Sequence, residues 1–213
     1  MWSTDYLQYL LGHFAVTVSA ISGVLAAGRK QIDLFGVVVL GLVTAVGGGS
    51  VRDIILGAHP VFWIADSSYV LNAVITAALT FYIARHWMVP RAVLDIADAF
   101  GLALFTMLGA AKALSFHTGM TDAVVLGVIT GAGGGIVRDV LVGEIPFVFR
   151  QQIYLYATAA VIGATAFVLL EAVLPGGSTN LLIGAALTLA LRLAAIRWKL
   201  TLPTFQPPTD DPS

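Results

Sequence analysis

The sequence predicts an all-α polytopic membrane protein with seven transmembrane helices, arranged as a 3+3 inverted repeat followed by a seventh helix. Hydrophobic residues make up 58% of the 213 residues and charged residues only 11%. That is too little charge to cover the surface of a water-soluble domain of this length. The mean hydropathy of +0.91 agrees with this class. A third observation, the duplication of one apolar segment, predicts the repeat.

Seven apolar segments come close to the length of about 20 residues that crosses a bilayer. They cover residues 6–27, 34–57, 69–88, 94–115, 121–143, 152–174 and 179–198. We assign residues 1–202 to a single transmembrane domain, with a first repeat at about 6–88 and a second at about 94–174. Residues 203–213 are polar and rich in proline, which predicts a disordered tail.

The distribution of Lys and Arg predicts the orientation, because cytoplasmic loops carry an excess of these residues. The connections and span ends that hold basic residues come at or after the end of the first, third, fifth and seventh spans: Arg29, Lys30, Arg85, Arg91, Arg150, Arg197 and Lys199. The opposite set of loops and ends contains Asp5, Asp66 and Glu171. We therefore expect the N-terminus outside the cell and the C-terminus in the cytoplasm.

The second and fifth spans are copies of each other at an offset of 86 residues. Between Val37 and Pro60, 13 of 24 positions are identical to their counterparts. Each unit contains three spans, and three is odd, so the second unit enters the membrane from the opposite side. The result is an inverted-topology repeat, an architecture in which matching interrupted helices indicate a site near the bilayer midplane.

The duplicated segment carries three consecutive glycines in each copy, Gly47, Gly48 and Gly49 in the first and Gly133, Gly134 and Gly135 in the second. Each glycine costs about 1 kcal/mol in a helix interior relative to alanine. One interpretation is that the helix unwinds there and exposes carbonyl and amide groups to an ion path. The alternative is close packing between helices, the commoner role of a membrane glycine. Thr44 and Thr130 lie one turn earlier, where their hydroxyls could face water or bond back to the helix.

An Arg-Asp pair follows each triplet: Arg52 and Asp53, then Arg138 and Asp139. Intramembrane charges indicate a functional site by default, although the arginines could also snorkel to the interface. We expect each aspartate to neutralise an arginine. Neighbouring residues project about 100° apart on a helix, so each partner could come from another span. Lys112 has no counterpart in the first repeat, and is either a snorkelling residue or one that senses voltage or plugs the pore.

Other functional classes are disfavoured. Gly48–Gly57 resembles a motif of tRNA nucleotidyltransferases, but those enzymes need a nearby carboxylate pair to hold two metal ions, and only Asp66 follows before the next span. We predict no enzymatic activity, no cofactor and no structural metal. The net charge of −1 gives no indication of nucleic-acid binding.

The two Gly-Gly-Gly-x-Val-Arg-Asp segments, within three plus three plus one spans, resemble those of the prokaryotic TRIC family, the trimeric intracellular cation channels. This family is related to bacterial proteins described as glycine-transporter-like. The resemblance covers all seven spans. It implies a homotrimer in the prokaryotic plasma (inner) membrane, with a pore in each protomer. It also implies kinks at the two glycine triplets, conduction of potassium and sodium, and no organic cofactor. By position alone, it relates Lys112 to a voltage response.

These observations predict a homotrimeric channel for monovalent cations, surrounded by membrane lipid and gated at the two triplets. In this hypothesis the glycines and the two threonines form the ion path, and Arg52, Asp53, Arg138, Asp139 and Lys112 support or gate it. A secondary transporter for a small solute such as glycine would also use interrupted helices in an inverted repeat. A structural or lipid-organising protein is the third alternative.

Overall fold

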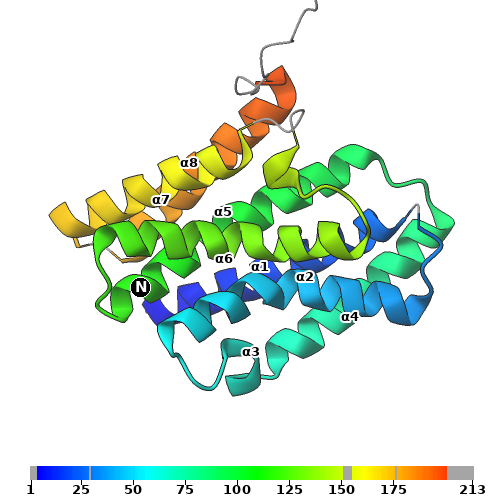
Figure 1. Cartoon of the computed structure of the whole chain (residues 1–213), viewed down its shortest axis with the longest axis horizontal. Helices are drawn as coiled ribbons and strands as arrows, with labels where there is room; N and C mark the ends of the chain where they lie inside the picture. Colours follow the sequence, from blue (N-terminus) through cyan, green and yellow to red (C-terminus); the bar gives the residue numbers. More distant parts are fainter. Residues whose placement is uncertain (1–3, 29, 151–154, 176, 201–213) are drawn as a thin grey trace, which may run out of the picture.

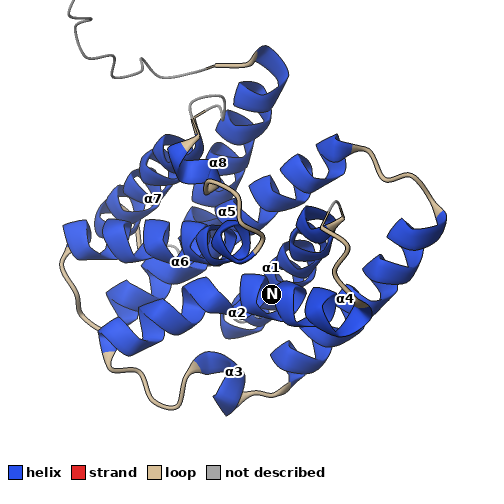
Figure 2. Cartoon of the chain, turned by 45° about the vertical axis from the view of Figure 1, so that its right-hand side comes forward, coloured by secondary structure: helices blue, strands red, loops and turns tan. Residues whose placement is uncertain are grey.

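The computed structural model describes residues 4–28, 30–150, 155–175 and 177–200. Arg29 and the predicted tail at 203–213 lie outside the described residues. Within them, every regular element is helical (Figure 2). The long helices are α1 (Thr4–Ala27), α2 (Leu34–Leu56), α4 (Ser68–His86), α5 (Arg91–Ser115), α6 (Met120–Leu141), α7 (Tyr156–Val173) and α8 (Ser178–Trp198). All seven are long and apolar enough to cross a membrane, which confirms the predicted fold class.

Two short helices occupy equivalent places in the repeats. Helix α3 (Phe62–Ala65) follows α2, and a 3₁₀ turn, η1 (Phe147–Phe149), follows α6. The helix before each also ends in the same way. α2 is followed by Gly57 at φ 65° and α6 by Gly143 at φ 70°, the left-handed conformation that terminates helices and that glycine adopts without strain. The turn after each duplicated span is therefore set by a repeated glycine.

The helices form two groups of three that meet at α2 and α6. In the first group α1, α2 and α4 pack on one another, and in the second α5, α6 and α7 do so. Helix α8 packs on α7 and α5. The two cartoon views place α7 and α8 on one side of the molecule and α4 on the other, with α1, α2, α5 and α6 between them (Figures 1 and 2). The duplicated spans therefore occupy the centre of the fold.

Small residues allow each group of three to pack closely. A Cβ atom added to Gly23 of α1 would lie 2.8 Å from the Cα of Gly41 on α2, and one added to Gly109 of α5 would lie 3.1 Å from the Cα of Gly127 on α6. These four glycines are counterparts in the repeat. The same contact is thus built twice, and it places Thr44 and Thr130 at the centre because each threonine lies one turn beyond its helix's glycine.

Candidate functional site: the crossing of α2 and α6

The glycine triplets form the point at which α2 and α6 cross. A Cβ atom at Gly48 would overlap the carbonyl oxygen of Thr130, and one at Gly134 would overlap the carbonyl oxygen of Thr44. Thr44 contacts Gly134, whereas Gly48, one turn later on α2, contacts Thr130, one turn earlier on α6. The helices α2 and α6 therefore run antiparallel. The backbones are close enough that only a hydrogen atom fits at these two positions.

Both helices remain helical throughout the triplets. The prediction that the chain unwinds there and exposes carbonyl and amide groups is therefore wrong for this structure. The physical reason is that the backbone groups of each triplet stay within the helix, while the missing side chains allow the other helix to approach. The alternative interpretation of the triplets, close helix packing, describes what the structure shows.

The three glycines of a triplet have different surroundings. A Cβ atom at Gly47 would meet its nearest neighbour, the Cα of Gly134, at 3.7 Å, which is an ordinary contact distance. Gly49 faces the ring of Phe62, and Gly135 faces the hydroxyl of Tyr156. The requirement for glycine is thus most stringent at the middle position of each triplet.

The Arg-Asp pair of each repeat forms the same hydrogen-bonded unit. Arg52 Nε donates to Asp53 Oδ1 at 2.8 Å, and Arg138 Nε donates to Asp139 Oδ1 at 2.8 Å. The second carboxylate oxygen accepts a backbone N–H from the short helical segment that follows, from Phe62 at 2.9 Å or from Phe147 at 2.8 Å. We call these two units the end caps, because each ties the last turns of α2 or α6 to the segment after it.

The end caps correct one expectation and confirm two. Each arginine reaches its sequence neighbour, since its long side chain can curl across the 100° between adjacent residues. Each pair also has the expected partner from another span, Lys112 for Asp53 and Asp98 for Arg138. The arginines do not snorkel: Arg52 is 5% exposed and Arg138 is 0% exposed, so both are enclosed by protein. The expectation that each aspartate neutralises an arginine is confirmed.

Helix α5 contributes a third charged side chain to each end cap, and the two contributions have opposite signs. Lys112 Nζ lies 2.8 Å from Asp53 Oδ1. At the other end, Arg138 Nη1 donates to Asp98 Oδ1 at 2.9 Å and to Ser22 Oγ at 3.0 Å. The prediction that Lys112 could simply snorkel is therefore wrong, because its ammonium group is held by a buried carboxylate.

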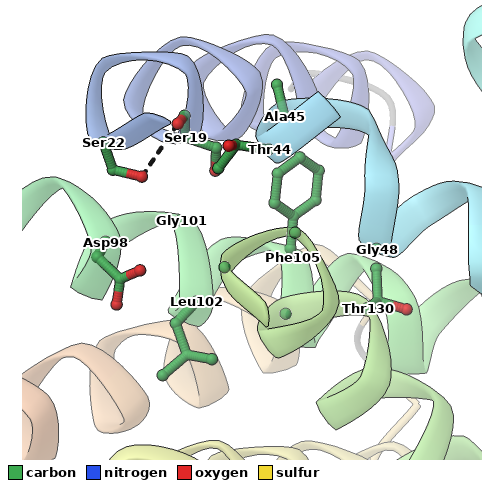
Figure 3. Close-up of a pocket in the computed structure, with 13 residues that line it drawn as sticks. Ser19, Ser22, Thr44, Ala45, Gly48, Asp98, Gly101, Leu102, Phe105 and Thr130 are labelled. Atoms are coloured by element: carbon green, nitrogen blue, oxygen red, sulfur yellow. Dashed lines mark hydrogen bonds between the residues drawn. The ribbon is translucent and has the colours of Figure 1, made fainter. Parts of the chain in front are cut away.

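A small polar cavity lies where α1, α2, α5 and α6 meet (Figure 3). The centre of a water molecule can occupy about 10 Å³ of this cavity, which is close to the minimum that one water requires. The lining comprises Ser19, Ser22, Thr44, Ala45, Gly48, Asp98, Gly101, Leu102, Phe105, Thr130, Gly131, Gly134 and Gly135. A path through this point would be constricted to about the width of a single water.

The two threonines both bond to their own helix, and both belong to the residues that line the cavity. Thr44 Oγ1 donates to the carbonyl of Leu40 at 2.6 Å, and Thr130 Oγ1 donates to that of Leu126 at 2.5 Å. Because each hydroxyl proton is engaged, the oxygen lone pairs are what each hydroxyl can offer the cavity. Lone pairs suit a cation or a water proton and repel an anion.

Several of the predicted site residues meet at the cavity, and others do not. Thr44, Gly48, Thr130, Gly134 and Gly135 line it, whereas Gly47, Gly49 and Gly133 do not. The contribution of α1 and α5 to the cavity was not predicted from the sequence. A signal existed on α5, where the lining residues Asp98, Gly101, Leu102 and Phe105 follow the i, i+3, i+4, i+7 spacing of one helix face.

A larger cavity of about 520 Å³ opens near one end of the crossing, and we call it the vestibule. Its basic residues are Lys30, Arg85, His86, Arg91 and Arg150, and its acidic ones are Asp139 and Glu144. Lys30 Nζ lies 2.9 Å from Glu144 Oε1, which links the loop after α1 to the loop after α6. The hydrogen bond from the Lys30 ammonium group holds the pKa of Glu144 below its ordinary value of 4.5.

The fold and this site define a multi-pass membrane protein in which two inverted repeats cross at paired glycines around a polar cavity. The profile of the family described as glycine transporter matches residues 9–85 and 95–172, one repeat each. The inner membrane protein YadS of Escherichia coli is 48% identical over 204 residues, covering 93% of this chain and 96% of the relative. A membrane protein of Vibrio cholerae is also 48% identical, covering 93% of this chain and 83% of the relative.

Solved structures agree with the sequence comparison. The TRIC trimeric intracellular cation channel orthologue from Rhodobacter sphaeroides is 40% identical, with a TM-score of 0.86 over 91% of this chain and 99% of the other. The chain therefore belongs to the prokaryotic TRIC family, whose sequence profile bears the description glycine transporter. The resemblance predicted from the duplicated glycine segment is confirmed.

Proposed function

We propose that the protein is a channel for monovalent cations, with a path through each protomer at the crossing of α2 and α6. The observation that carries the proposal is the cavity at this crossing. Among the described residues, its polar lining consists of serines, threonines and one carboxylate, without Lys or Arg. Oxygen ligands of this kind can replace part of the hydration shell of a cation.

The structure corresponds to a closed path in this proposal. A cavity with room for about one water does not admit a hydrated potassium ion, so conduction requires α2 and α6 to separate. Separation has to break the contacts between the middle glycines and the threonine carbonyls. It also has to displace the end caps, which hold the final turns of both helices.

Lys112 is the residue we assign to the voltage response. It carries the one positive charge on α5 that contacts an end cap, and its partner Asp53 is buried. A field that moves this ammonium group relative to the carboxylate would weaken one end cap. Moving a full elementary charge across 100 mV is worth about 2.3 kcal/mol, comparable in size to a buried ionic hydrogen bond.

Three further features complete the proposal. We assign potassium and sodium as the permeant ions, a homotrimer as the assembly and the prokaryotic inner membrane as the location. Related structures are TRIC cation channels, and one relative is named an inner membrane protein. Apolar side chains of α4 such as Leu71, Ile75 and Leu79 are exposed on this protomer and suit lipid or a neighbouring subunit.

The deciding experiment is the reversal potential of single-channel currents from purified protein in planar bilayers. We expect unitary currents whose reversal potential follows the potassium gradient and not the chloride gradient. Replacement of potassium by sodium on one side should shift the reversal potential by only a few millivolts. Absence of unitary currents, or reversal at the chloride potential, would refute the proposal.

The rival function is a small-solute transporter, which the description of the matching family profile favours. It predicts uptake of glycine into proteoliposomes that saturates with concentration and depends on an ion gradient, without unitary currents. The same protein preparation can be used for both assays, so the two functions are compared directly.

The orientation is part of the proposal and has its own test. The vestibule collects Lys30, Arg85, Arg91 and Arg150, which supports a position on the cytoplasmic side, because cytoplasmic loops carry an excess of Lys and Arg. The sequence contains no cysteine, so single cysteines can report on each side. A membrane-impermeant maleimide applied to intact spheroplasts should label Met120→Cys and spare Met88→Cys. The reverse pattern would invert the assignment.

A further inference from the structure

The two end caps differ in net charge, because α5 adds Lys112 to one of them and Asp98 to the other. At one end Arg52 and Lys112 face the single carboxylate of Asp53, which gives an excess of one positive charge. At the other end Arg138 faces two carboxylates, Asp98 and Asp139, which gives an excess of one negative charge. Asp95 and Arg192 lie near the second cluster and contribute one charge of each sign, so they leave that excess unchanged.

This asymmetry departs from the repeat. The counterpart of Asp98 is Gly12 and the counterpart of Lys112 is Ala26. Asp98 and Lys112 are 14 residues apart on α5, about 21 Å along the helix at 1.5 Å per residue. One helix therefore places a carboxylate at one end of the crossing and an ammonium group at the other, while everything else in the end caps is duplicated.

Asp98 also has an oxygen that the end cap does not use. Its Oδ1 accepts from Arg138, whereas its Oδ2 is buried and has no hydrogen-bond partner among the described residues. The side chain is 5% exposed and lines the cavity. Figure 3 shows Asp98 and Ser22 on one side of the cavity and Gly48 and Thr130 on the other. A buried carboxylate oxygen without a partner is costly, and a bound cation would remove that cost.

We propose that Asp98 is the residue that makes the path select cations, and that its Oδ2 binds a partly dehydrated alkali cation beside Ser19 and Ser22. Both serines line the same cavity. Ser22 Oγ accepts from Arg138 and donates to the carbonyl of Ser19 at 3.0 Å, so its position is fixed. This inference rests on the proposed channel. One experiment therefore measures ion permeation, and a second measures cation binding at Asp98 without requiring any current.

The first experiment compares the potassium-to-chloride permeability ratio of Asp98→Asn with that of the wild type. Asparagine keeps an acceptor for Arg138 and removes the charge. We expect the ratio to fall by at least about tenfold, because one unit charge already has that effect on an ion still roughly 10 Å from the site at an effective dielectric constant of about 20. Asp98→Glu should retain most of the selectivity. Asp122→Asn, which removes an exposed carboxylate that lines neither this cavity nor the vestibule, should leave the ratio unchanged.

A purely structural role for Asp98 would change the open probability and leave the reversal potential of the remaining currents at the wild-type value; that result overturns the proposal. The second experiment uses anomalous diffraction from crystals grown in rubidium chloride. A rubidium peak within coordination distance of the Asp98 carboxylate, lost in Asp98→Asn, supports the site even if the wild type carries no current. No peak at wild-type Asp98 overturns it, independently of the channel proposal.

Discussion

Alanine substitutions within one glycine triplet separate packing from hinge bending as the role of the glycines. At Gly48 the new methyl group would overlap the carbonyl oxygen of Thr130, whereas at Gly47 it would lie 3.7 Å from its nearest neighbour. Both substitutions gain about 1 kcal/mol of helix propensity. Only Gly48→Ala also causes overpacking, which raises the free energy of the closed state by about 1–3 kcal/mol.

The expected result follows from where that cost falls. If the closed state contains the contact and the open state does not, Gly48→Ala shifts the equilibrium toward opening by about 1–3 kcal/mol, a factor of roughly 5 to 160 in the open-to-closed ratio. Gly47→Ala should change this ratio less than about threefold. Gly28→Ala, at an exposed loop position with its nearest atom at 3.4 Å, serves as the control for a glycine outside the crossing.

The assay is the open probability of single channels, with the unitary conductance recorded from the same traces. Thermal unfolding in detergent checks that each variant is folded. If the glycines act as flexible hinges, both alanine variants should stiffen the helix and lower the open probability to a similar extent. Equal effects of Gly47→Ala and Gly48→Ala would therefore refute the packing argument.

The remaining predictions concern the charged groups. Arg138→Gln leaves two buried carboxylates without their cation and should destabilise the protein by about 3–5 kcal/mol, measured by thermal unfolding in detergent. Arg52→Gln should cost clearly less, because Lys112 still neutralises the carboxylate at that end; equal costs would contradict the pairing. Lys112→Gln should shallow the voltage dependence of opening, and an unchanged slope would remove Lys112 from the voltage response. The lowered pKa of Glu144 means that its ion pair with Lys30 contributes fully above pH 4.5 and is lost as the pH falls through the lowered value. The carboxyl ¹³C shift of Glu144 should therefore titrate below pH 4.5, and Lys30→Gln should move the midpoint upward; a midpoint unmoved by that substitution would contradict the cause.

The sequence was sufficient to predict the helices because bilayer length and composition decide them. The repeat could also be predicted from the sequence. The positions that are identical in its two copies include residues that an apolar span does not require, such as Thr44, Arg52 and Asp53. The state of the glycine triplets was not predictable in this way. A triplet weakens a helix and also lets another backbone approach, and the balance depends on the partner helix, which only the fold supplies.

The same limit explains Asp98. In sequence it lies near the start of an apolar span, where an acidic residue interacts favourably with the helix dipole. Its role at the cavity depends on Arg138, 40 residues later, and on Ser22 of another helix. The i, i+3, i+4, i+7 pattern from Asp98 to Phe105 indicates a shared face but not which helix covers it. Burial of Arg52 was missed for a related reason: the structure encloses its guanidinium group with Asp53 and the Phe62 ring, whose centroid lies 5.7 Å away.

The two end caps also provide a test that distinguishes a channel from a carrier. Each cap closes one end of the crossing through an aspartate that accepts a backbone N–H, from Phe62 at one end and Phe147 at the other. Asp53→Asn and Asp139→Asn keep that acceptor but weaken the ionic part of the cap.

In a channel both ends have to be open together, so each substitution raises the open probability and the double variant raises it further. In a carrier the ends open alternately, so either single substitution holds the protein open to one side and slows turnover, whereas the double variant restores the balance and part of the rate. Additive gains in current, without recovery of solute uptake in the double variant, are the outcome we expect; recovery of uptake in the double variant would instead establish alternating access.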